Sequence, residues 1–438
     1  MELTREELEK DEDQRLAPYA LRSAAARRGV RVGPEGRIFD YRTEFQRDRD
    51  RILHSRAFRR LRLKSHGGAF PPAERYRDRL THTLAVSQMC RTVARGLGLN
   101  EDLVEAIALG HEVGMPPFGP HGEAALGSLL AGVDGGFSYA VQSLRVVDRL
   151  EKRYAHEGLN LTDATREGIL KHAGWPPPEG SPAAPPELSP QWAPLFEAQV
   201  VAAVEPAARA IEDLDDGLRA GDVDSESVER LPIVRELMRR VAAAPARGPG
   251  RRAAGRAAMN RRANLIHRGL THMLVTGIIH HSRRTLRAWA REHAVTGPRE
   301  LLRARPHVQA GMVGLTPAAA RMYDGLGDFV SRHLHQGAWL SAAASRARHL
   351  LGALFRALAD NPRLAEDYML LRFKQDEGGP YLRDVPPAAM EAELARRYRG
   401  SRPFARIVAD HIAGMTDLFT VAEHERLLGP FAMGGKTP

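Results

Sequence analysis

The chain has 438 residues, of which 43% are apolar and 27% are charged. This composition is typical of a folded globular protein and excludes a disordered chain. No run of about 18 apolar residues occurs, which argues against a membrane span. Cys90 is the single cysteine, so an internal disulfide and a site built from several cysteines are excluded. The net charge of +10 either favours anionic partners, such as nucleotides or nucleic acid, or reflects an arginine-rich composition alone.

Helical patterns dominate the chain after its N-terminal residues. Residues 1–16 are acidic and polar and hold no apolar signal core, so we expect a cytoplasmic protein. Beyond them, apolar residues recur close to a 3.6-residue period, whereas alternating strand patterns are scarce. The sequence therefore predicts an all-α fold. Helices are expected over residues 77–97, 161–172, 195–219, 228–243, 260–293, 318–358 and 403–428.

Two segments predict loops and divide the chain. Residues 175–194 are rich in proline, and residues 244–258 combine glycine, proline and arginine. The second segment is either a surface loop or a contact for nucleic acid or an effector. We expect an N-terminal arm (1–45), a helical core (46–243), the basic loop (244–258) and a helical C-terminal region that packs on the core (259–438).

Two histidines on consecutive predicted helices suggest a metal site. Asn100 is a typical N-cap for the second helix, whose apolar face carries His111. Glu112 follows at once, and a turn over residues 114–119 then ends the helix. A single histidine on an apolar face is more often a core residue. Here a second histidine, His82, and the adjacent carboxylate favour a metal ion with nitrogen and oxygen ligands.

Several motifs follow one another along residues 19–428. They are RDRDRILHSRAFRRL (47–61), RLTHTL (79–84), LVEAIALGH (103–111), PPFG (116–119), GLNLT (158–162), GILKH (168–172), EAQVV (197–201), DLDDGL (213–218) and VADHIAGMTD (408–417). In order and spacing this set resembles the dGTPase-like deoxynucleoside-triphosphate triphosphohydrolases of the HD superfamily. The resemblance implies a multi-helix HD-domain phosphohydrolase fold, with the catalytic core in residues 46–243 and a helical C-terminal extension.

The family pattern is a divalent metal held by a histidine, a His-Asp pair and a distant aspartate. The matching positions are His82, His111, Glu112 and Glu205, so glutamate replaces both aspartates. We expect Mn or Mg as the cofactor, with Co, Fe, Ni and Zn as alternatives, although imidazole with carboxylate suits Mg less well. Pro206 directly follows Glu205 and predicts a kink in the helix at that ligand.

The resemblance also implies a pair of catalytic residues. In the family, a histidine after the Pro-Pro-Phe-Gly turn acts in proton transfer with a glutamate three residues later. Pro120 occupies the histidine position and Met115 departs from the pattern before the turn, whereas Glu123 keeps the place of the glutamate. We expect His121 to act with Glu123. Alternatively, Glu123 caps the following helix and His121 is an exposed loop residue.

Four further side chains are expected to contact the substrate. Arg60 and Lys64 are candidates to bind phosphate, and the alternative for Arg60 is a structural ion pair. His66 occupies the position of a family glutamine that faces the sugar, and Arg209 occupies that of a family tyrosine.

The resemblance implies metal-dependent hydrolysis of a dGTP-like deoxynucleoside triphosphate. Water activated by the metal attacks the α-phosphorus and yields a deoxynucleoside and inorganic triphosphate. Because the site departs from the family pattern, two alternatives stay open: a pseudoenzyme that senses nucleotides or binds nucleic acid, and a phosphohydrolase with another ester substrate. The resemblance also implies a homo-oligomer, with a dNTP or single-stranded DNA as effector and no membrane partner.

Overall fold

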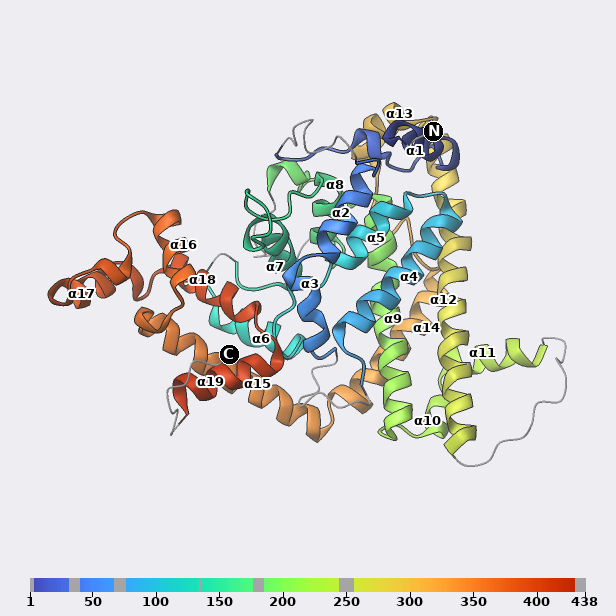
Figure 1. The fold of residues 1–438 in the computed structure, drawn as a ribbon. Coiled ribbons are helices and arrows are strands. Elements are labelled where there is room, and N and C mark those ends of the chain that lie inside the picture. Colours follow the sequence, from blue (N-terminus) through green and yellow to red (C-terminus); the bar gives the residue numbers. More distant parts are fainter. Residues whose placement is uncertain are drawn as a thin grey trace.

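A computed structural model describes residues 4–30, 40–66, 76–133, 135–175, 185–243 and 256–429. These residues form nineteen α-helices with short 3-10 and π-helical turns and contain no β-strand, which confirms the predicted all-α fold (Figure 1). No helix in this described part has both the length and the apolar content to span a bilayer.

The first half of the described chain is built from eleven helices. They are α1 (Arg5–Arg15), α2 (Glu44–Leu53), α3 (Arg56–Arg60), α4 (Arg79–Leu97), α5 (Glu101–Gly110), α6 (Pro120–Leu129), α7 (Tyr139–Arg145), α8 (Asp163–Lys171), α9 (Phe196–Ala220), α10 (Ser225–Glu229) and α11 (Pro232–Ala243). The second half adds α12 (Arg256–Glu292), α13 (Pro298–Ala304), α14 (Pro317–Val330), α15 (Ala338–Asp360), α16 (Asp367–Glu377), α17 (Pro387–Glu393), α18 (Arg402–Ala413) and α19 (Asp417–Leu428).

The predicted ranges cover the long helices but miss three breaks, and they leave out α1, α2, α3, α6, α7, α13, α16 and α17. The segment 228–243 divides into α10 and α11, because Pro232 suits only the first turn of a new helix. The segment 318–358 passes through a π-helical turn (Ser331–His335) before Gly337 starts α15. The segment 403–428 divides where the Thr416 side chain accepts from Phe419 and caps α19. Pro206, by contrast, lies inside α9 and does not end it.

The predicted loops fall largely outside the described residues. Of the proline-rich segment, residues 176–184 lie outside them, and so do residues 244–255 of the basic loop. Helix α12 begins at Arg256, inside the range that we assigned to that loop.

The centre of the molecule is a packed layer of long helices. Figure 1 shows α4, α9 and α12 alongside one another, and α5 packs against both α4 and α9. The main apolar core lies between them and is formed by residues such as Val93, Ile107, Val204 and Leu274. A second core joins α6 to α15, α16 and α18 around Leu126, Leu351 and Phe373. The elements that carry the histidines are thus held by apolar packing on several sides.

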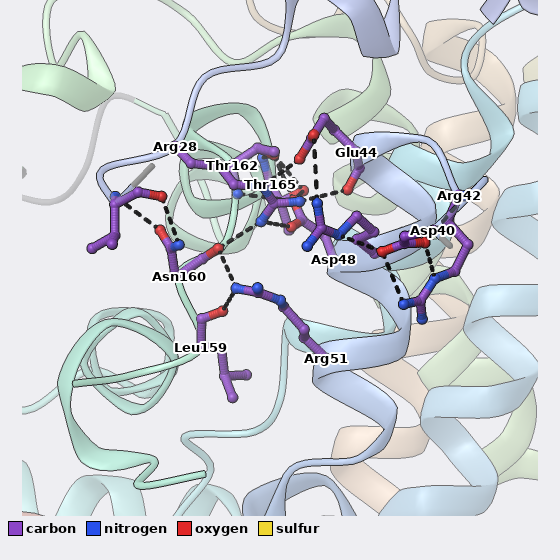
Figure 2. Close-up of polar contacts among 12 residues, drawn as sticks. Arg28, Asp40, Arg42, Glu44, Asp48, Arg51, Leu159, Asn160, Thr162 and Thr165 are labelled. Atoms are coloured by element: carbon purple, nitrogen blue, oxygen red, sulfur yellow. Dashed lines mark hydrogen bonds and ion pairs between the residues drawn. The ribbon is translucent and has the colours of Figure 1, made fainter. Parts of the chain in front are cut away.

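A buried polar network fastens α2 to the segment before α8 (Figure 2). Asp48 is fully buried and accepts the backbone N–H of Thr162 at 2.9 Å, the Thr162 hydroxyl at 2.6 Å and the Thr165 hydroxyl at 2.7 Å. Arg28 pairs with Asp48 at 2.6 Å and with Glu44. Because these groups satisfy one another, Asp48 of the charge run 47–51 has a structural role here.

Lys64 fastens the chain before α4 to two distant segments. Its buried ammonium donates to the backbone oxygen of Met115 and, at 2.8 Å, to that of Ala413. Next to it, Asp417 accepts the backbone N–H groups of Ser65 and Phe118, each at 2.9 Å. Burial, which outweighs the nearby charge of Asp417, lowers the pKa of Lys64 to about 7.

Lys64→Met tests this buried amine through the pH dependence of stability. Between the folded pKa of about 7 and the ordinary value of 10.5, the unfolded chain holds a proton that the folded protein has released. The wild type should therefore gain free energy of unfolding relative to Lys64→Met as the pH rises through this window, measured by urea denaturation. The exposed Lys374→Met variant is the control; the same pH dependence in Lys64→Met and wild type would refute the shift.

Candidate metal centre

His82 lies near the start of α4, and its ring is fixed by a carboxylate from α9. Its Nδ1 lies 2.6 Å from Oε2 of Glu212, so Nδ1 carries a hydrogen and donates it. The ring is fully buried, and its Nε2 has no hydrogen-bond partner in the described part of the chain. A carboxylate that orients an imidazole in this way is the usual outer partner of a metal-binding histidine.

The ring of His111 is also oriented through its Nδ1, here by a backbone oxygen at the end of its own helix. It is the C-cap of α5, and its Nδ1 lies 2.6 Å from the backbone oxygen of Ala108. Its Nε2 is therefore left as the acceptor, buried and without a partner among the described residues. Two imidazoles on consecutive helices thus each have an Nε2 without a hydrogen-bond partner among the described residues.

Two buried carboxylates complete the cluster. Glu112 follows α5 directly and Glu205 lies on α9, with its Oε1 at 3.8 Å from Nε2 of His82. One ligand atom from each of His82, His111, Glu112 and Glu205 lies within 4.8 Å of the other three. The structure therefore brings all four predicted metal ligands together.

Arginines neutralise both carboxylates. Arg79, at the first position of α4, donates to Oε1 of Glu112. Arg209, one turn after Glu205 on α9, pairs with Glu205 and lies 3.8 Å from Oε1 of Glu112. Burial alone would raise the pKa of each carboxyl, but Arg79 lowers the pKa of Glu112 to about 2. Burial raises the pKa of Glu205 too, but Arg209, His82 and His111 together outweigh burial and hold that pKa well below its ordinary range.

A divalent ion fits this donor set. Imidazole nitrogens with carboxylate oxygens are ligands that Mn, Fe, Co, Ni and Zn accept. Burial would lower the pKa of His82, but the carboxylates of Glu205 and Glu212 outweigh it and raise that pKa to about 9. The cluster therefore favours positive charge at Nε2 of His82, where a proton and a metal ion compete for one lone pair.

The Pro-Pro-Phe-Gly turn shapes the space around Arg79. Phe118 and Gly119 both have positive φ, 63° and 55°. A side chain at Gly119 would place its Cβ 2.7 Å from Nη2 of Arg79. Glycine is therefore required here by the backbone conformation and by the close approach of the guanidinium.

The two predicted catalytic residues have different interaction partners. Glu123 lies on α6, and its Oε1 accepts the backbone N–H of Tyr139 at 2.8 Å, the capping contact that was the alternative for this residue. Burial raises the pKa of Glu123. Burial, and then the charges of His335 and Arg348, lower the pKa of the half-buried His121. Within the described residues, no hydrogen bond or ion pair joins His121 to Glu123.

Tyr139 connects Glu123 to another buried histidine, His172. Its hydroxyl lies 3.0 Å from Nε2 of His172, whose Nδ1 lies 2.8 Å from the backbone oxygen of Ile169. The His172 ring in turn meets the edge of the His111 ring, with centroids 5.1 Å apart. Burial lowers the pKa of His172 to about 4, so this ring is a neutral neighbour of the cluster near pH 7.

The four predicted substrate contacts lie in different surroundings. Lys64 is buried against backbone oxygens, and the exposed Arg60 donates to a backbone oxygen of the C-terminal segment at 2.8 Å. His66 is buried against the ring of His82, with centroids 4.0 Å apart. Of the four, Arg209 is the residue that pairs with the ligand carboxylates.

Helical spacing could have identified two residues that received no role from the sequence. Arg79 precedes His82 by three positions, and Glu212 follows Glu205 by seven, so each pair shares a helix face. Arg209 lies between them on the same face of α9. The pairing of these charges depends on how α4 and α9 cross, which spacing alone does not give.

The HD domain model matches residues 79–215, which carry the cluster, and the model of a phosphohydrolase-associated domain matches residues 380–426. The match and the buried histidine–carboxylate cluster together identify the chain as an HD-domain protein.

Relatives of similar length carry one name. Deoxyguanosinetriphosphate triphosphohydrolase-like protein 1 of Deinococcus radiodurans is 36% identical over 97% of this chain and 100% of its own. The similarly named proteins of Azoarcus sp. and Parvibaculum lavamentivorans are 36% and 35% identical over 96% and 94% of this chain, and 97% and 96% of theirs. The chain belongs to the family of deoxyguanosinetriphosphate triphosphohydrolase-like proteins.

Glu212→Gln tests the orientation of His82. The substitution keeps the size of the side chain but removes the charge that fixes the ring, so Mn²⁺ affinity should fall about 10- to 100-fold. Equilibrium dialysis measures this affinity, and circular dichroism checks the fold. Asp215→Asn is the matched control, because Asp215 lies on the same helix and pairs with Arg77 at 2.6 Å. Equal affinity of Glu212→Gln and wild type would contradict the role.

Proposed function

We propose that the protein hydrolyses a dGTP-like deoxynucleoside triphosphate to a deoxynucleoside and inorganic triphosphate in a metal-dependent reaction. The observation that carries the proposal is the convergence of two unused imidazole nitrogens and two carboxylates, each within 4.8 Å of the others. Membership of a family whose relatives bear triphosphohydrolase-like names supports the substrate class. Mn or Mg is the proposed ion, with Co, Fe, Ni and Zn as alternatives.

In this proposal His82, His111, Glu112 and Glu205 hold the ion. The ion supplies Lewis-acid activation of water and of the phosphoryl oxygen. Glu123 suits a proton carrier, because burial raises its pKa toward the working pH. His121 would need to approach Glu123 to share that proton, because no hydrogen bond joins the two side chains within the described residues.

The substrate's phosphates would meet positive charge on the open side of the cluster. Arg209 is the proposed phosphate contact, since its side chain is 31% exposed next to the buried carboxylates. Guanidinium groups bind phosphate through paired hydrogen bonds. Arg60, Lys64 and His66 stay secondary candidates, because each already has another contact in the structure.

A pseudoenzyme is the second candidate, and one observation favours it. Arg79 and Arg209 together supply two positive charges beside Glu112 and Glu205, which is the charge of a divalent ion. In such a protein, the fold and a nucleotide site would persist without hydrolysis.

A turnover assay separates the two candidates. The purified protein is incubated with each of the four dNTPs and with Mn²⁺, Mg²⁺, Co²⁺ or no metal, and free triphosphate is measured by ion-exchange chromatography. We expect metal-dependent release that disappears in His111→Ala and persists in the control His280→Ala, which changes an exposed histidine of α12. If a folded wild type yields no triphosphate with any dNTP or metal, the pseudoenzyme is the better description.

We also propose that the protein is a homo-oligomer and that a dNTP or single-stranded DNA effector binds away from the metal centre. A cleft of about 1220 Å³ lies between α4, the residues after α1 and the C-terminal part of α12, and it supports the proposed effector site. None of its described lining residues is acidic, and six are arginines: Arg15, Arg95, Arg283, Arg284, Arg287 and Arg291. Arg95 follows His82 by 13 residues on α4, which places the cleft about 20 Å from the cluster.

The double variant Arg283→Ser/Arg287→Ser tests this cleft. Loss of two phosphate contacts should weaken binding of the effector several-fold and reduce its salt dependence. Fluorescence anisotropy without metal, with a labelled oligonucleotide in one arm and a labelled dNTP in the other, identifies which effector is held. Arg239→Ser/Arg240→Ser is the control, because both arginines pair with Glu236 on α11. Equal losses in the two double variants would refute the assignment.

A further inference from the structure

The guanidinium of Arg209 lies where the carboxylates of the candidate metal centre converge. It pairs with Oε1 of Glu205 and lies 3.8 Å from Oε1 of Glu112. Its side chain is 31% exposed, whereas those of Glu112 and Glu205 are 0% and 8% exposed. A cation on a flexible side chain therefore reaches the buried carboxylates from the solvent side.

Arg209 neutralises the carboxylates of the cluster but does not hydrogen-bond to its histidine nitrogens. The carboxylates gain a cation, but Nε2 of His82 and Nε2 of His111 have no hydrogen-bond partner among the described residues. A buried ring nitrogen without a hydrogen-bond partner is unfavourable. A divalent ion would satisfy the nitrogens and the oxygens together, so the arrangement with Arg209 inside is incomplete.

The two arginines of the centre differ in how firmly they are held. Arg79 is 1% exposed and donates to the backbone oxygens of Ser65 and His66 as well as to Glu112. Arg209 pairs with the carboxylates of Glu205 and Glu112, and within the described chain it donates no hydrogen bond to a backbone oxygen. Arg79 is thus a fixed part of the site, whereas Arg209 has little besides Glu205 to keep it in place.

We propose that Arg209 is a displaceable cation that competes with the metal ion for Glu205 and Glu112. It neutralises the carboxylates while the ion is absent and turns outward, onto a phosphate-like dianion, when the ion enters. Because the ion and the anion both favour the outward position of Arg209, each should strengthen the binding of the other. The identity of the anion as a substrate phosphate rests on the proposed function, whereas the competition with metal does not.

Metal binding without any nucleotide tests the competition. We expect Arg209→Met to bind Mn²⁺ about 5- to 100-fold more tightly than the wild type, the usual range of such couplings, in equilibrium dialysis. Arg219→Met is the matched control, because Arg219 pairs with Asp215 at i,i+4 spacing on the same helix and its loss changes the net charge equally. Arg209→Tyr, with the residue type that the family pattern has here, provides a second variant if Arg209→Met does not fold. Mn²⁺ affinity at or below the wild-type value in a folded variant overturns the proposal.

Sulfate, a tetrahedral dianion, tests the outward position. It should tighten Mn²⁺ binding by the wild type several-fold relative to chloride at equal ionic strength, and it should have no such effect on Arg209→Met. The same effect of sulfate on both proteins would overturn the coupling. These measurements are independent of turnover: a protein that shows the competition but no triphosphate release retains this inference and loses the proposed function.

Discussion

The burial of two carboxylates at one point is the constraint around which the site is built. Glu112 and Glu205 are both removed from water, and an isolated buried carboxylate would be unstable by several kcal/mol. Two arginines from different helices neutralise the carboxylates: Arg79 on α4 pairs with Glu112, and Arg209 on α9 pairs with Glu205. The close packing of α4, α5 and α9 is therefore possible only because these charges are balanced where the three helices meet.

The same packing sets the chemistry of the histidines. His82 and His111 each use Nδ1 on a partner supplied by a helix, and each leaves Nε2 unused. Such preorganisation favours a metal ion, because the rings are already oriented before it binds. In the part of the chain that the structure describes, neither nitrogen has a hydrogen-bond partner. A proton on His82, whose pKa the neighbouring carboxylates raise, competes with the ion.

Glutamates at positions 112 and 205, where the family resemblance implies aspartates, fit the presence of Arg209. A glutamate reaches one methylene further than an aspartate, and here both carboxylates reach a guanidinium while remaining within 4.8 Å of the histidine nitrogens. Longer carboxylates and an additional cation are thus parts of one arrangement.

The sequence by itself determined the all-α fold, the cap at Asn100 and the two histidines on inner helix faces, because these follow from periodicity and local capping. The convergence of the four ligands was anticipated only through the family resemblance. Only the tertiary structure showed that the buried Lys64 donates to backbone oxygens of two other segments and that Glu123 accepts the first backbone N–H of α7. It also showed that Arg209 lies 3.8 Å from Glu112. Each of these depends on a contact between segments far apart in the chain, where a side chain's partner is set by the crossing of helices and not by its neighbours in sequence.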